Sequence, residues 1–581
     1  MRQQAILTGI ALMSLCCLLY LWGLGGVPFY TKGEPREATV VWEIYTTHEW
    51  VLPLRNGHII PSKPPLFHWL GTLVSYANGE VNEFTIRFPS AVLATMGVLL
   101  TYSTGVALWG VEAGAVAAVV LATSFEWSRA ATTARVDMTL TVCMVAAFLF
   151  FLFIYRRGEV RRRDAFFFYV LLGLATLAKG PVGAILPGLT VVAFLAWRRD
   201  LVFLRQLHVV TGGLLVLLIA GSWYGLALWQ GGSEFFTKQI MKENVLRFFT
   251  NDAGHDHPFY YFLPNLFLGM APWSFFFPPL IMFLYRQRHA WAEKEYLYLI
   301  IWIATVFLFY SVAKSKRSVY ILPLYPAVAL LIGAWWQELR QGSAAMSATF
   351  FRLIQASGYL CLLFVGVTIA AIACQALGYD ALGLIRPLLH PRDQSNLPLF
   401  TDIVPLQPYA FLLWSVVTAI AVGLLVLGIQ RRYWGWVFTG LATFTISAVL
   451  LVNVVFQPTV ATTRTYRPFM ERVVKTVGQA PLFFFLTFDN GALYYAKRRV
   501  PHYDTSLVKP EVGYFLLMRK EEWDEIAARN EPNLVMIDVS EGTGPKDRHR
   551  LALVQAPKGA YVSIAEPVVP ANEDESDADA L

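Results

Sequence analysis

Charged residues are scarce in this chain of 581 residues: Asp, Glu, Lys and Arg make up 15%, whereas hydrophobic residues make up 56%. A mean hydropathy of +0.49 argues against a soluble globular protein. Cysteine is also rare, and none of the five has the spacing of metal ligands. All five lie in apolar stretches, which favours small apolar side chains in helices over a disulfide framework or a zinc site. They are Cys16, Cys17, Cys143, Cys361 and Cys374.

The sequence also lacks an internal repeat, a low-complexity linker and a basic–aromatic module of the kind that binds nucleic acid. The first apolar stretch has a thin basic start and no small-x-small cleavage site. We therefore interpret it as a retained membrane anchor and not as a signal peptide. No nucleic-acid partner is expected.

Long apolar runs are what the chain has instead. Runs of about 15 to 25 residues match the thickness of a bilayer core, and they predict a polytopic α-helical membrane protein with about thirteen transmembrane helices. The three shortest runs also fit tilted or re-entrant segments. The predicted spans are 5–24, 86–109, 112–124, 137–155, 166–179, 182–197, 207–229, 263–285, 296–313, 319–338, 349–377, 409–429 and 433–456.

Arginine clusters predict the orientation of these spans. The clusters lie in loops 156–163, 198–205, 286–288 and 431–432, all on one side if the spans alternate. Loops rich in Lys and Arg stay in the cytoplasm, so the net charge of +7 is explained mostly by topology. The other side then receives loops 25–85, 125–136, 230–262, 314–318 and 378–408, together with everything after about residue 457.

Composition divides the chain into a transmembrane bundle, residues 1–457, a small α/β domain, residues 458–570, and an acidic tail, residues 571–581. The tail is expected to be disordered because it is acidic and almost free of apolar residues. Within the small domain, the sequence predicts strands at 482–488, 514–518 and 533–538 and a helix at 520–530.

Charged side chains gather on the predicted outer side. Carboxylates there could deprotonate a hydroxyl group or hold a divalent cation, and cations could bind a phosphate or diphosphate. Lys314, Lys316 and Arg317 are the clearest example, because three cations there oppose the positive-inside bias. They predict an anion at the outer face, and contact with anionic lipid headgroups is the alternative.

Other outer residues also have a simpler interpretation. Asp137 begins an apolar helix, where it could merely interact with the helix dipole. The charged first loop could be a solvated loop with interfacial anchors. His255, Asp256 and His257 could bind a metal, but two histidines at i, i+2 also suit an ordinary polar loop.

A series of short motifs runs through the outer loops and helix ends in a specific order. It comprises Glu34-x-Arg36, Trp50-Val-Leu-Pro53, Asn56-Gly57, Lys63-Pro64-Pro65-Leu-x-x-Trp69, Arg135-x-Asp137, Ala178-Lys179-Gly180-Pro181, Glu243-Asn244-x-x-Arg247-Phe248 and Lys314-Ser-Lys316-Arg-x-x-Tyr320. This order resembles the ArnT-like membrane glycosyltransferases of the GT-C fold, which are related to the protein O-mannosyltransferases. The resemblance covers nearly the whole bundle.

The resemblance implies an enzyme of the bacterial inner membrane with a periplasmic C-terminal domain. Such an enzyme takes a sugar from a polyprenyl-phosphate carrier, undecaprenyl phosphate in bacteria. It passes that sugar to lipid A, another envelope glycan or a protein. A protein O-mannosyltransferase-like enzyme is an alternative, and a polytopic lipid or sugar transporter is a further one. The expected partners are a lipid-linked sugar donor, a lipid or glycan acceptor and membrane lipids. We expect a monomer, and a divalent cation is possible without being required.

The resemblance also assigns roles to residues. Glu34 and Asp137 correspond to the acidic residues of the family, with Glu37 as a helper because Gly33 occupies the place of the usual Asp. Ser62 likewise replaces a Glu before Lys-Pro-Pro. The residues expected to bind the donor phosphate are Arg36, Lys63, Lys179, Lys314, Lys316 and Arg317, and those expected to position substrates are Arg135, His58 and Tyr320.

Overall fold

The computed structural model describes residues 2–246, 257–286, 288, 294–341, 348–377, 379, 383, 387, 407–504, 513–528, 534–544 and 549–559. Contacts along the chain group these residues into two compact units. Unit 1 is drawn from residues 1–23, 90–223 and 256–457, and unit 2 from residues 24–89, 224–255 and 458–581. The N-terminal part, a middle segment and the C-terminal part of the chain thus contribute to unit 2.

Every predicted span coincides with one helix, a continuous helical run or a bent pair of helices. The spans correspond to α1 (Arg2–Tyr20), α4 (Glu83–Trp109), α5 (Val111–Thr123) with α6 (Phe125–Ala131), α7 (Val136–Arg157), α8 (Arg162–Lys179), α9 (Val182–Trp197), α11 (Val209–Val216) with η1 (Leu217–Gly221) and α12 (Ser222–Phe235), α14 (Phe262–Gly269) with η3 (Trp273–Phe276) and α15 (Phe277–Arg286), α16 (Lys294–Val312), η5 (Ser318–Leu324) with α17 (Tyr325–Gln341), α18 (Ala348–Ala376), α21 (Pro408–Arg431) and α22 (Trp434–Leu451).

The polytopic fold is therefore confirmed, while the count of thirteen stays a prediction. Within the described residues, eight helices are long and apolar enough to cross a membrane, or up to ten if each bent pair is one span. The bent pairs are α5 with α6, at 67°, and Phe262–Gly269 with Trp273–Arg286, at 108°. Helix α9 has only 16 residues, which is short for a full crossing.

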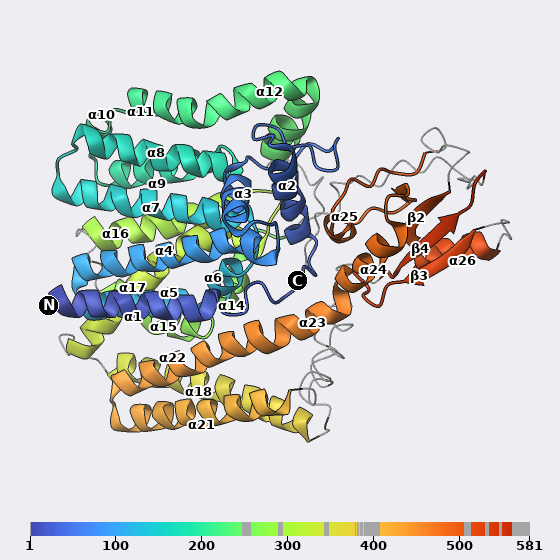
Figure 1. Cartoon of the computed structure of the whole chain (residues 1–581). Helices are drawn as coiled ribbons and strands as arrows, with labels where there is room; N and C mark the ends of the chain where they lie inside the picture. Colours follow the sequence, from blue (N-terminus) through green and yellow to red (C-terminus); the bar gives the residue numbers. More distant parts are fainter. Residues whose placement is uncertain are drawn as a thin grey trace. The chain divides into compact units, whose positions relative to one another are not determined.

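Small residues let helices of unit 1 approach closely. A Cβ built on Gly105 of α4 would lie 2.6 Å from the Cα of Gly114 on α5, and one on Gly333 of α17 would lie 2.3 Å from the carbonyl oxygen of Ala113. Backbones at this distance pack by van der Waals contact, which holds helices together where lipid supplies no hydrophobic driving force. Helices α7, α8 and α9 lie side by side in the same bundle (Figure 1).

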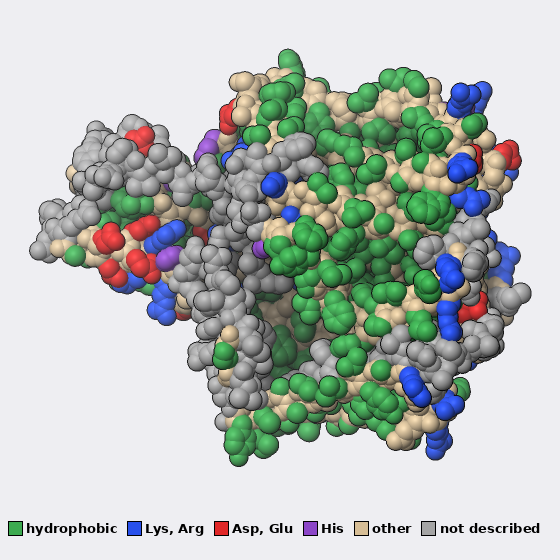
Figure 2. All heavy atoms as spheres, turned by 180° about the vertical axis from the view of Figure 1, so that it is seen from behind, with side chains coloured by type: hydrophobic (Ala, Val, Ile, Leu, Met, Phe, Trp, Pro, Cys, Tyr) green, Lys and Arg blue, Asp and Glu red, His purple; other side chains and the backbone are tan. Residues whose placement is uncertain are grey.

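The surface of the bundle is strongly apolar. Figure 2 shows a broad area of hydrophobic side chains, with Lys and Arg gathered at one end of it. This end is where the chain's N-terminus lies (Figure 1). Exposed residues such as Leu217, Leu218 and Trp229 would be unfavourable in water but suit contact with lipid.

The N-terminal part of unit 2 contains two helices that the sequence prediction left as a loop: α2 (Gly33–Thr47) and α3 (Leu66–Asn78). A tight turn lies between them, with Asn56 at φ 55° and Gly57 at φ 83°. The middle part supplies the π-helical segment η2 (Phe236–Leu246). The segment 25–85 is therefore a folded structure and not an open loop.

The C-terminal part of unit 2 is a small α/β domain, as predicted. Its sheet has the order β1-β2-β4-β3, with β1 parallel to β2 and the other neighbours antiparallel. The strands are β1 (Leu482–Phe484), β2 (Tyr514–Arg519), β3 (Val535–Val539) and β4 (Leu551–Ala556), and the helices are α23 (Gln457–Arg464), α24 (Arg467–Val477), α25 (Asn490–Ala496) and α26 (Lys520–Ala528).

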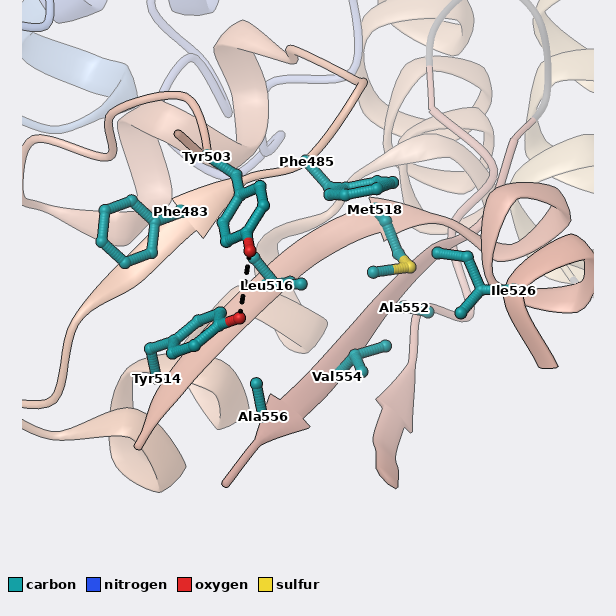
Figure 3. Packing of buried hydrophobic residues seen from close by; sticks show 10 residues of the cluster. All are labelled: Phe483, Phe485, Tyr503, Tyr514, Leu516, Met518, Ile526, Ala552, Val554 and Ala556. Atoms are coloured by element: carbon teal, nitrogen blue, oxygen red, sulfur yellow. Dashed lines mark hydrogen bonds between the residues drawn. The ribbon is translucent and has the colours of Figure 1, made fainter. Parts of the chain in front are cut away.

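One face of this sheet carries a compact hydrophobic core (Figure 3). Phe483, Leu516 and Val554 are buried in it, and Ile526 of α26 packs on the same cluster. Burying one such side chain is worth about 1.5–3 kcal/mol. Three predicted strands are confirmed, whereas the apolar run that forms the interior strand β4 was not recognised. The predicted acidic tail 571–581 lies outside the described residues.

Candidate active site

Glu34 lies in the first turn of α2 and is 2% exposed. Arg87 of α4 binds both of its carboxylate oxygens: Nε donates to Oε1 at 2.7 Å and Nη2 donates to Oε2 at 3.1 Å. The same guanidinium donates through Nη1 to the carbonyl oxygens of Leu24 and Val27. A bidentate pair of this kind fixes both the position and the plane of a carboxylate. Glu34 is therefore an oriented carboxylate.

Glu37, one turn further along α2, has different partners. Its Oε1 accepts a hydrogen bond from Arg36 at 2.8 Å, and its Oε2 lies 2.6 Å from Nε2 of His68 on α3. Burial alone would raise the pKa of the Glu37 carboxyl, but Arg36 and His68 outweigh it and hold the pKa well below its usual range. Glu37 is therefore ionised at neutral pH, and it is better suited to orienting a group than to removing a proton.

Lys63 lies just before α3, where Pro64 and Pro65 lead into the helix. It forms an ion pair with Glu243 of η2. His58 belongs to the turn between α2 and α3; it is exposed, and its Nδ1 lies 3.2 Å from the carbonyl oxygen of Asn56. Lys63 thus joins the N-terminal and middle segments of unit 2.

In unit 1, the hairpin of α7 and α8 brings two predicted residues together. Asp137 lies in the first turn of α7 and Lys179 ends α8, and the two side chains form an ion pair. The Lys179 Nζ also lies 4.4 Å from the ring centroid of Tyr320. A cation over an aromatic ring adds about 0.5–2 kcal/mol. Lys179 is therefore held between a carboxylate and a ring. Arg135 is the N-cap residue of α7 and precedes Asp137 in the chain.

The basic segment that precedes η5 is anchored in unit 1. Lys316, 5% exposed, donates to the carbonyl oxygen of His257 at 2.9 Å. The His257 ring stacks on Tyr261, with ring centroids 4.2 Å apart. Lys314 is exposed and Arg317 is half-buried. Cations fixed in this way could stabilise an anion with little reorganisation.

Glu126 of α6 contacts the start of η5 and is itself paired with Arg129 of the same helix. Arg129 donates to Glu126 at 2.6 Å and 3.0 Å, and the Ser318 hydroxyl donates to the same carboxylate at 3.3 Å. Glu126 is 4% exposed along its side chain. The bend between α5 and α6 thus supplies a buried carboxylate that the sequence prediction did not single out.

The structure brings several of the predicted residues together within each unit. Asp137, Lys179 and Tyr320 meet in unit 1, and Glu37 meets Arg36 in unit 2. Lys63 pairs with Glu243 instead, and Glu34 with Arg87. The predicted metal site cannot be followed, because His255 and Asp256 lie outside the described residues. Among the described residues, no group of three or more His, Cys, Asp or Glu side chains could hold a metal ion.

Two partners were missed by sequence reasoning: Arg87 and His68. A signal for Arg87 was present, since it is a charged residue near the start of a predicted span and a buried charge requires a partner. His68 lies inside the Lys63–Trp69 motif, but at one of the two positions where that motif specifies no residue type. Its role follows only from the packing of α3 on α2.

Comparison with known proteins agrees with the resemblance. Residues 62–224 match the family model described as dolichyl-phosphate-mannose-protein mannosyltransferase. The undecaprenyl phosphate-alpha-4-amino-4-deoxy-L-arabinose arabinosyl transferase of Pectobacterium carotovorum is 28% identical over 450 residues, which are 75% of this chain and 74% of that protein. The corresponding enzyme of Shewanella sediminis is 31% identical over 321 residues, which are 54% of this chain and 57% of that protein.

A solved structure decides the fold. The crystal structure of ArnT from Cupriavidus metallidurans bound to undecaprenyl phosphate matches with a TM-score of 0.74 and 20% identity, over 94% of this chain and 97% of that one. This chain has an ArnT-like GT-C fold. The apo state of the same ArnT matches with a TM-score of 0.69. The predictions of an ArnT-like resemblance and of a GT-C fold are thereby confirmed.

Proposed function

We propose that this protein transfers a sugar from an undecaprenyl-phosphate carrier to an acceptor at the outer face of the bacterial inner membrane. The similarity over three quarters of the chain to an enzyme named for that carrier carries the proposal. The sugar to test first is 4-amino-4-deoxy-L-arabinose, which the same name specifies, and the acceptor to test first is lipid A.

In the proposed reaction, the acceptor hydroxyl oxygen attacks the anomeric carbon of the donor sugar. The bond from that carbon to the phosphate oxygen breaks, and the polyprenyl phosphate leaves with the bonding electrons. The hydroxyl proton passes to a carboxylate or to water. The leaving phosphate gains charge as the bond breaks, so cations fixed nearby lower the barrier.

We assign the carboxylate role to Glu34 and Asp137, with Glu37 as an ionised helper. Arg87 orients Glu34, and Lys179 orients Asp137. The donor phosphate is assigned to the outer-face cations, several of which already have an anionic or carbonyl partner. An arriving phosphate therefore joins or replaces an existing partner at Lys63, Lys179 and Lys316. These cations are Arg36, Lys63, Lys179, Lys314, Lys316 and Arg317, and the substrate-positioning residues are Arg135, His58 and Tyr320.

The proposal is tested with purified full-length protein in nanodiscs, supplied with the undecaprenyl-phosphate-linked sugar and lipid A. Transfer of one sugar to lipid A, seen by mass spectrometry, is the expected result. Lipid A from cells with and without the gene provides the matched comparison. If neither lipid A nor any other envelope glycan changes in mass, the assignment to envelope glycans is wrong.

Protein O-mannosyltransferase-like activity is the second candidate, and the family match over residues 62–224 favours it. Mass spectrometry of envelope proteins from the same two strains separates the two candidates. Hexose-modified peptides that disappear with the gene would favour the second candidate, and unchanged peptides beside altered lipid A would favour the first.

The outer-face position of the α2–α3 region and of the C-terminal domain is part of the proposal. Cysteines at His58 and Glu525, both exposed, should react with an impermeant thiol reagent in intact cells. A cysteine at Arg162, exposed at the opposite predicted side, should react only after the inner membrane is opened. The reverse labelling pattern would overturn the topology.

A further inference from the structure

Arg87 is the partner that orients Glu34, so whatever holds Arg87 also bears on the reaction. Its guanidinium binds Glu34 and the carbonyl oxygens of Leu24 and Val27. It also lies over the ring of Phe29, with Cζ 5.1 Å from the ring centroid. The segment 24–29 thus wraps around Arg87 immediately before α2 begins.

The C-terminal domain holds this segment through one hydroxyl group. The Tyr495 hydroxyl of α25 accepts a hydrogen bond from the Phe29 backbone N–H at 2.8 Å. The same hydroxyl donates to Oε1 of Glu83, also at 2.8 Å. Glu83 precedes Arg87 by one turn of α4. A single phenol oxygen therefore contacts both segments that position Arg87: residues 24–29 and the first turn of α4.

Burial and neighbouring contacts hold the Tyr495 side chain in place. The side chain is 8% exposed, and Arg467 forms an ion pair with the same Glu83 carboxylate at 3.3 Å. Burial and the Glu83 carboxylate raise the pKa of Tyr495 far above its usual range, so the hydroxyl keeps the proton that it donates. Its neighbour Tyr494 packs edge-on against Phe29, with ring centroids 5.1 Å apart.

The local sequence explains why α25 presents these rings. Asp489 caps the helix by accepting from the backbone N–H of Ala492 at 2.9 Å, which fixes where α25 begins. Lys497 ends the helix in the left-handed conformation, and its Nζ donates to the carbonyl oxygen of Val81. The helix is thus tied to the start of α4 at its C-terminal end.

We propose that Tyr495 is a positioning residue for transfer, acting on Glu34 through Phe29, Glu83 and Arg87. The C-terminal domain is then a structural part of the active site and not a separate module. This inference rests on the proposed function, because it assumes that Glu34 takes part in the reaction. Preorganisation gives the physical reason: a displacement of about 1 Å in a reacting group can cost about 100-fold in rate.

Tyr495→Phe in the full-length protein tests the proposal. The change keeps the ring and its packing but removes both hydrogen bonds. We expect kcat to fall about 10-fold or more while KM for the donor changes less than about twofold. Tyr503→Phe is the matched control: it removes a hydroxyl pair with Tyr514 inside the sheet core and should leave kcat unchanged.

Hydrogen exchange provides a readout that does not depend on activity. In Tyr495→Phe, peptides covering residues 24–37 should exchange faster than in wild type, whereas Tyr503→Phe should leave them unchanged. Faster exchange with unchanged kcat would overturn the proposal, and so would unchanged exchange. If the wild-type protein transfers no sugar at all, the proposed function fails, and the exchange of residues 24–37 still decides whether Tyr495 holds this segment.

Discussion

The ion pairs of unit 1 and unit 2 are built in different ways. In unit 1, Asp137 and Lys179 lie 42 residues apart, at the start of α7 and the end of α8. Two consecutive antiparallel helices must bring these ends together. In unit 2, Glu34 and Arg87 lie 53 residues apart, with the rest of α2, a tight turn and the whole of α3 between them. Only the packing of that whole segment decides which partner Glu34 has.

This difference has a consequence for robustness. The pair in unit 1 depends on a hairpin whose formation is local in sequence. The pair in unit 2 depends in addition on the C-terminal domain, through Tyr495 and Glu83. We therefore expect unit 2 to be the part in which distant substitutions affect Glu34, the proposed catalytic carboxylate.

The largest effect should come from removing the carboxylates themselves. Glu34→Gln and Asp137→Asn keep the size of the side chain but remove its charge, and turnover should fall about 100-fold or more in each. Steady-state transfer assays in nanodiscs measure the loss. Asp164→Asn is the control, because Asp164 is a buried carboxylate paired with Arg157 at the other end of α8. Near-normal transfer by Glu34→Gln would move the role to Glu37 or another residue.

The next largest effect should be a loss of unfolding free energy when the buried ion pair of unit 2 is broken. Arg87→Ala leaves Glu34 buried without its cation, which costs about 3–5 kcal/mol of unfolding free energy. Arg472→Ala removes a half-exposed pair with Asp538, which costs about 0–1 kcal/mol. Thermal unfolding of the two purified variants gives the comparison. Equal losses of unfolding free energy in the two variants would show that the buried Glu34–Arg87 pair stabilises the protein no more than the half-exposed pair.

Donor affinity should fall by a smaller amount when single cations are removed. Lys63→Ala, Lys314→Ala and Lys316→Ala should each weaken binding of the polyprenyl phosphate by about 1–3 kcal/mol, the scale of a hydrogen bond to a charged group. A titration with fluorescent polyprenyl phosphate measures this, with Lys520→Ala on the surface of α26 as the control. Unchanged affinity in all three variants would contradict the phosphate site.

The smallest effect should be a change in how stability depends on pH. The pKa of Glu37 is lowered in the folded protein. Its contribution to the unfolding free energy is therefore complete above the ordinary glutamate pKa of 4.5 and is lost progressively as the pH falls below that value. Burial raises the pKa of Glu522, so its contribution has the opposite sign.

Unfolding midpoints measured between about pH 3 and pH 6 test both signs. Glu37→Gln should reduce the loss of stability on acidification, and Glu522→Gln should increase it. If the unfolding midpoints of both variants depend on pH in the same way as those of the wild type, the inferred pKa shifts of Glu37 and Glu522 are wrong.

Several features could be predicted from the sequence because they depend on local segments. The length and hydropathy of each apolar run predict a helix at each position, and each run has a helical counterpart in the structure. The strands at 482–488 and 514–518 were recognised from their apolar composition for the same reason. Counting spans predicted Asp137 and Lys179 at the same end of the bundle, and the hairpin of α7 and α8 brings the two side chains together.

The sequence by itself thus determined the membrane class, the positions of the helices and the charged residues at their ends, since hydropathy acts along short stretches of chain. Only the tertiary structure decided that Arg87 holds Glu34, that His68 holds Glu37, and that Tyr495 joins the C-terminal domain to Phe29 and Glu83. The physical reason is that a buried charge or hydroxyl takes its partner from whatever packing brings near it. That packing joins residues more than 400 positions apart, as between Tyr495 and Glu83.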